Sequence, residues 1–88
     1  MEVKIKMFAL KEKNGPGYVS SLHAKQPGGG CFDLTHNPNH AICFSRYEAA
    51  SAVLGLMERT GCLDASAFNL PPWELCVSVV DIGGKIPY

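Results

Sequence analysis

The sequence has no excess of charge of either sign. Its 88 residues carry eight Lys or Arg side chains and eight Asp or Glu side chains, a formal net charge of zero. The basic balance typical of nucleic-acid-binding proteins is absent, and so is the dense negative charge with which a protein imitates DNA. We therefore expect no direct nucleic-acid binding. Charged residues make up 18% and apolar residues 47% of the chain, which is the composition of a folded protein rather than a disordered one.

The sequence also lacks a hydrophobic run of the roughly 18–20 residues that cross a bilayer. Its first residues alternate apolar and charged side chains, unlike a secretory signal, in which a charged start precedes an apolar stretch. We therefore expect no membrane association and a cytoplasmic location. In that reducing compartment the four cysteines, Cys31, Cys43, Cys62 and Cys76, are expected to be thiols rather than disulfides.

Length and periodicity predict a single domain over residues 1–88, because so short a chain has room for one core. Apolar and charged residues alternate over 2–7, the turn-forming run Asn-Gly-Pro-Gly occupies 14–17, and a second strand-like segment follows at 18–22. Together they predict a β-hairpin with a longer loop. A short strand is predicted at 31–34 and a long one at 73–82, in which Leu75, Val77 and Val79 share one face.

One helix is predicted between Ser45 and Gly61. Ser45 and Glu48 have the spacing of a capping box, and Gly61 is a typical helix stop. One apolar stripe is formed by Ala50, Val53, Leu54 and Met57. The interior glycine at position 55 is expected to permit close approach to a strand.

The predicted order β-β-(β)-α-β indicates an α+β fold. One helix would pack on one face of a small antiparallel sheet of three to four strands. The opposite face is then expected to be wet or covered by a partner. The last strand is able to pair with its own copy, so a homodimer is one alternative.

Four potential zinc ligands, Cys31, His36, His40 and Cys43, lie close together in the sequence. Zinc prefers a tetrahedron of such ligands, and it would stabilise a small domain with a thin core. Their spacing matches no common zinc finger. The competing interpretation places both cysteines in the core, on either side of a polar turn, with both histidines exposed. A zinc-stabilised binding domain is therefore the alternative hypothesis.

No complete catalytic motif is present. Residues able to act as nucleophile, base or orienting group occur at Cys43, His40, His36 and Asp33, but in no nucleophile-elbow or helix-start context. The glycine triplet at 28–30 precedes a predicted strand rather than a helix, so it does not indicate a phosphate loop. We expect no enzymatic activity and no cofactor.

The large apolar side chains exceed what one thin helix–sheet layer needs to bury; they are Tyr18, Tyr47, Met57, Trp73 and Tyr88. Aromatic and arginine side chains are candidates for an interface. Such residues are the usual anchors of protein interfaces. The candidate partner-binding residues are Tyr18, Arg46, Tyr47, Arg59 and Trp73. In the competing interpretation, Trp73 only closes one end of the core.

The segment from Gly17 to residue 50 is similar to a pattern in small phage- and plasmid-borne proteins. In these proteins a hairpin leads into A-x-x-F-S-x-x-E-A at a helix start, which here is Ala41 to Ala49. The likeness covers about residues 3–60, and in size and element order the chain resembles several anti-CRISPR proteins. The resemblance implies a non-enzymatic inhibitor that blocks a larger host protein or ribonucleoprotein complex by steric or allosteric contact. It carries over no site residue, because these proteins share no binding motif.

Overall fold

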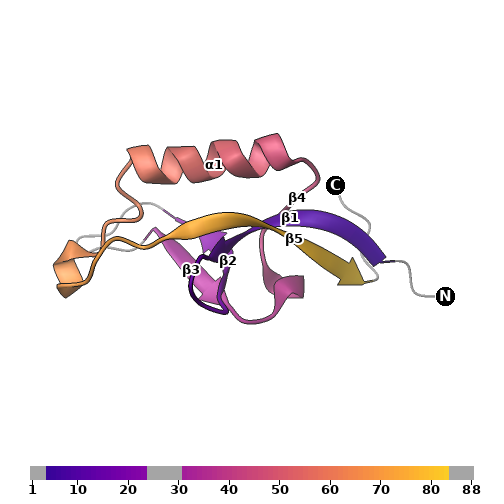
Figure 1. The fold of residues 1–88 in the computed structure, drawn as a ribbon, viewed down its shortest axis with the longest axis horizontal. Helices are drawn as coiled ribbons and strands as arrows, with labels where there is room; N and C mark the ends of the chain where they lie inside the picture. Colours follow the sequence, from indigo (N-terminus) through magenta and orange to yellow (C-terminus); the bar gives the residue numbers. More distant parts are fainter. Residues whose placement is uncertain (1–3, 24–30, 84–88) are drawn as a thin grey trace.

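The structure, a computed structural model, describes residues 4–23 and 31–83. Within these ranges it has five strands, one α-helix and two 3-10 helices (Figure 1). In chain order they are β1 (Lys4–Glu12), β2 (Tyr18–Leu22), β3 (Phe32–Thr35), η1 (Pro38–His40), β4 (Cys43–Phe44), α1 (Tyr47–Arg59), η2 (Ser66–Phe68) and β5 (Leu75–Gly83). The predicted α+β class with an antiparallel sheet is confirmed, and β4 is an additional short strand. Residues 1–3 of the predicted hairpin and the glycine triplet at 28–30 lie outside the described residues.

Strand β1 is the centre of the sheet. On one side it pairs with β5, antiparallel and without interruption, from Lys4 opposite Gly83 to Glu12 opposite Leu75. On its other side β1 pairs with β4, where Phe8 lies opposite Phe44, and with β2. Strand β3 continues the sheet beyond β2. The predicted hairpin is therefore present, and the last strand pairs with the central strand β1 along its whole length.

The main core lies between α1 and one face of the sheet (Figure 1). Its buried members are Leu10, Val19, Ala50, Met57, Leu63 and Leu75. Because side chains alternate between the faces of a strand, Leu10 and Val77, which lie opposite each other, both point to this core. The predicted helix stripe is confirmed: Ala50 and Met57 are buried, and Val53 and Leu54 pack against the core.

The opposite face of the sheet carries a second core of Met7, Ala9, Val80 and Ile82. In Figure 1, η1 lies on this side, below the strands, and it packs against β5. Ala41 and Cys43, in the segment after η1, also pack on this core. The expectation that this face is wet or covered by a partner is therefore wrong for these residues, because the chain covers them itself.

The ends of α1 correct one detail of the prediction. Arg46 is the N-cap and makes no side-chain capping hydrogen bond, so the capping box of Ser45 and Glu48 is not formed. At the other end, the Thr60 hydroxyl donates to the Leu56 carbonyl at 2.8 Å, and Gly61 has a φ of 78°. That left-handed conformation favours glycine and ends the helix, as predicted.

The molecule is elongated, with extents of 48 × 22 × 21 Å. Strands β1 and β5 run side by side along much of this length, and η2 lies at one end (Figure 1). None of the helices in the described ranges combines the length and apolar character needed to cross a membrane.

Candidate functional site

Trp73 lies at the end of the molecule where the connection from α1 enters β5. Its backbone N–H donates to the Leu63 carbonyl at 2.7 Å. Its ring meets Phe32 of β3 edge to face, with the ring centroids 5.9 Å apart. Pro71 and Pro72 precede it and restrict the approaching backbone. These contacts hold the half-buried Trp73 side chain between β3 and the connection.

A hollow of about 260 Å³ opens beside this aromatic pair, lined by Phe32, Asp33, Leu34, Phe68 and Trp73. We call it the Trp73 hollow. Phe68, from η2, is 56% exposed, and Leu34 of β3 is also exposed. Asn69 follows Phe68 in a left-handed conformation, φ 56°, and leads to the exposed Leu70. Apolar side chains gathered around a surface hollow are typical of a binding interface.

A second hollow, of about 530 Å³, also borders Trp73. Its lining includes the carboxylates Glu58, Asp64 and Glu74 but, as a cation, only Lys13. The Asp64 carboxylate accepts a hydrogen bond from the Ser66 N–H at 2.9 Å, which links this hollow to η2. Trp73 therefore borders both an acidic hollow and the apolar Trp73 hollow.

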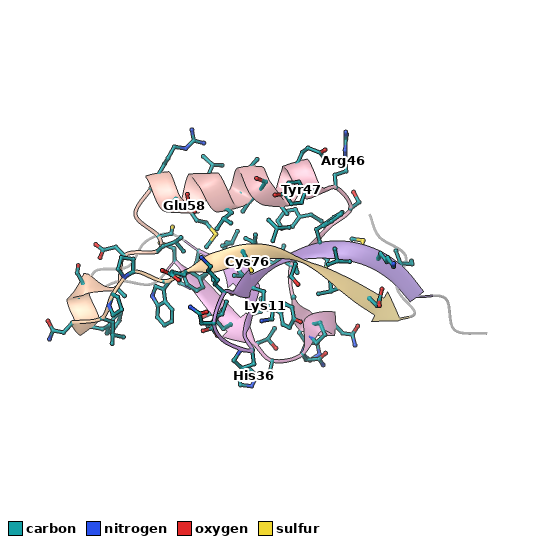
Figure 2. The ribbon with its side chains drawn as sticks, in the orientation of Figure 1. Lys11, His36, Arg46, Tyr47, Glu58 and Cys76 are labelled. Carbon is teal, nitrogen blue, oxygen red and sulfur yellow. The ribbon has the colours of Figure 1, made fainter. Side chains whose placement is uncertain are left out.

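Tyr47 and Arg46 lie at the start of α1. Tyr47 is 54% exposed, yet its ring meets Phe8 edge to face at 6.0 Å. Figure 2 shows the Tyr47 side chain on the sheet side of the helix and the Arg46 side chain pointing away from the sheet. Arg46 is exposed, and so is Val79, which lies opposite Phe8 in the sheet. This surface is separate from the Trp73 hollow.

The five predicted binding residues do not form one surface. Tyr18 packs against the second core, on the far face of the sheet from α1. Arg59 is exposed at the last turn of a helix whose 13 residues separate it from Arg46 by about 20 Å. Only Trp73 lines the hollow. Leu34, Phe68 and Leu70 were not predicted from the sequence. Phe68 and Leu70 could have been found as large apolar residues in the segment 62–70, which is otherwise mostly small and polar.

The four predicted zinc ligands differ in how far they are buried. Cys31 is buried and Cys43 half-buried, whereas His36 and His40 are exposed. Figure 2 shows His36 at the side of the molecule opposite α1. Within the part of the chain that the structure describes, no three His, Cys, Asp or Glu side chains form a group able to hold a metal ion. The geometry matches the competing interpretation, with core cysteines and exposed histidines.

One polar cluster was not anticipated, at Asp33. Its carboxylate accepts a 2.7 Å hydrogen bond from the Ser21 hydroxyl and lies 3.7 Å from His23 Nε2. In a nucleophilic triad the hydroxyl must donate to the imidazole base, and the carboxylate must orient that imidazole. Here the Ser21 hydroxyl donates to the carboxylate instead. The cluster therefore ties β2 to β3 and lacks the order of a triad.

Comparison with known proteins found no relative of this chain. No family model matches the chain, and no curated protein or solved structure matches it either. The interpretation of the site therefore follows from its own geometry. An aromatic pair joins β3 to the residues that enter β5, an apolar hollow lies beside it, and an acidic hollow borders the same tryptophan.

Proposed function

We propose that this protein is a non-enzymatic inhibitor of phage or mobile-element origin that binds and blocks a host defence complex, in the manner of an anti-CRISPR protein. It acts in the host cytoplasm through steric or allosteric contact with a larger protein or ribonucleoprotein. The observation that supports this proposal best is the Trp73 hollow, with the exposed Phe68 at its rim.

The hollow has the features of an interface anchor point. Phe68 and Leu70 are 56% and 51% exposed, so covering the exposed half of each side chain contributes about 1 kcal/mol. In the neighbouring aromatic pair, Phe32 lies in β3 and the Trp73 N–H is bonded to Leu63, so little ordering free energy is lost when a partner binds. Aromatic residues around such a pocket are the usual hot spots of binding.

The acidic hollow supports a partner that handles nucleic acid. Glu58, Asp64 and Glu74 present negative charge next to the same tryptophan. Proteins that handle nucleic acid carry clusters of Lys and Arg that neutralise phosphates. Such a basic surface is complementary to this end of the molecule, and complementary charge steers association.

The test is to mix the purified protein with CRISPR effector complexes of different types. We expect co-elution with at least one complex and loss of its target cleavage. Phe68→Ser should abolish both, because it removes the exposed apolar rim of the hollow. Leu56→Ser is the matched control, since Leu56 is 53% exposed on α1 and does not line the hollow. No co-elution and undiminished cleavage across all types would refute the inhibitor proposal.

Trp73 supplies an independent readout because it is the single tryptophan of the chain. Covering the Trp73 hollow should move its fluorescence emission to shorter wavelength, since the indole leaves water. Binding with unchanged emission would show that the partner uses another surface, such as the one around Arg46 and Tyr47.

A further inference from the structure

Within residues 4–23 and 31–83, the outer edge of β5 is long and no described strand pairs with it. Among the strands that the structure describes, β5 pairs only with β1. Its register with β1 has no bulge, and its sequence, LCVSVVDIG, has no proline or lysine. Natural sheets normally protect such an edge with a bulge, a proline or a lysine, or they keep the edge strand short. The opposite edge follows that rule, because β3 has four residues and an irregular register with β2.

Exposed apolar side chains lead to this edge. Val79 is 58% exposed and lies opposite Phe8 in the sheet, on the face covered by α1. The ring of Tyr47, itself 54% exposed, packs on Phe8. Tyr47, Phe8 and Val79 therefore form a continuous row from the start of the helix to the sheet edge. A strand that pairs with the outer edge of β5 would cover Val79, the residue of this row that lies on β5.

We propose that this edge pairs antiparallel with β5 of a second copy of the chain, about a two-fold axis at Val79. Val79 then faces the partner's Val79, and Val77 faces the partner's Asp81. The two sheets become one, with both helices on the same face, and the backbone groups of the open edge gain hydrogen-bond partners.

Charge favours a second copy as the occupant. Asp81 is the single charged residue within β5, and it lies opposite Lys6 in the β1–β5 ladder. In the two-fold register Asp81 meets an apolar valine, so no like charges face each other. The whole chain has zero formal net charge, so two copies approach without long-range repulsion. A strongly charged strand from another protein would not be complementary to this edge, because Asp81 is its one charged residue.

The dimer is tested on the protein alone, so the result is independent of the inhibitor proposal. We expect light scattering across a concentration series to show conversion from monomer to dimer. Val79→Lys should raise the dimer dissociation constant by at least about tenfold, because two like charges then face each other across the axis. Leu56→Lys is the control and should leave the constant unchanged, since Leu56 on α1 is 53% exposed against 58% for Val79. Circular dichroism verifies that each variant is folded.

A charge exchange tests the register itself. Val79→Lys and Val79→Glu should each be monomeric alone, and their mixture should form a heterodimer, because position 79 faces its own copy. Three results would overturn the proposal: a monomer at every concentration up to about 1 mM, a dimer that Val79→Lys does not weaken, or a mixture of the two variants that remains monomeric.

Discussion

Phe32 and Trp73 meet edge to face, with ring centroids 5.9 Å apart and ring planes at 81°. The contact joins β3 to the residues entering β5, two segments far apart in the sequence. Both rings also line the Trp73 hollow. The residues that stabilise this end of the fold are therefore also the base of the proposed binding surface, while Phe68 contributes only to the surface.

This division of roles predicts different effects of two phenylalanine substitutions. Phe32→Ala should lower the free energy of unfolding by about 2 kcal/mol, because it removes apolar contacts to the main core and the edge-to-face pair. Phe68→Ala should change it by less than about 0.5 kcal/mol, since exposed substitutions away from special features cost little. Urea denaturation followed by circular dichroism measures both. Equal losses would contradict the assignment of Phe68 to the surface.

Gly55→Ala should stabilise the protein by about 1 kcal/mol, because alanine is the better helix former. The prediction that Gly55 permits close approach to a strand is wrong: a Cβ placed there meets nothing within 4 Å. No contact therefore offsets the gain in helix propensity. Thermal unfolding of the variant measures the effect, and a lower midpoint than that of the natural chain would show that the space above Gly55 is occupied.

Gly61→Ala should have the opposite effect and destabilise the protein by about 1 kcal/mol, because residues with a Cβ are strained at positive φ. Gly61 has a φ of 78° at the end of α1. Gly61→Asn is the matched variant, since asparagine tolerates this conformation better than alanine. The same unfolding measurement should rank the natural chain above Gly61→Asn and Gly61→Ala last. An alanine variant as stable as the natural chain would contradict the left-handed turn.

Chelation should leave the stability of the protein unchanged. The buried Cys31 and the exposed His36 and His40 do not form a metal-binding group. We therefore expect the thermal midpoint of protein purified without an affinity tag to be the same with and without a chelator. Bound zinc close to one equivalent, together with a lower midpoint after its removal, would restore the zinc-stabilised alternative, because structural zinc contributes directly to folding.

Some local predictions failed where the path of the backbone decides the outcome. Ser45 and Glu48 have the spacing of a capping box, but α1 begins at Tyr47 with Arg46 as its N-cap. The short strand β4 ends at Phe44, and its pairing with β1 determines how the chain enters the helix. A four-residue pattern contains no information on that entry, so it predicted a helix but not its first residue.

The amino-acid order alone determined four of the five described strands, the helix and their apolar faces. The period of two in Leu75, Val77 and Val79 and the helical stripe ending at Met57 are local properties. Only the tertiary structure decided which segments meet. It brought Phe32 to Trp73, placed η1 against the second core, and left the edge of β5 open among the described strands. These outcomes depend on contacts between distant parts of the chain, which local periodicity does not encode.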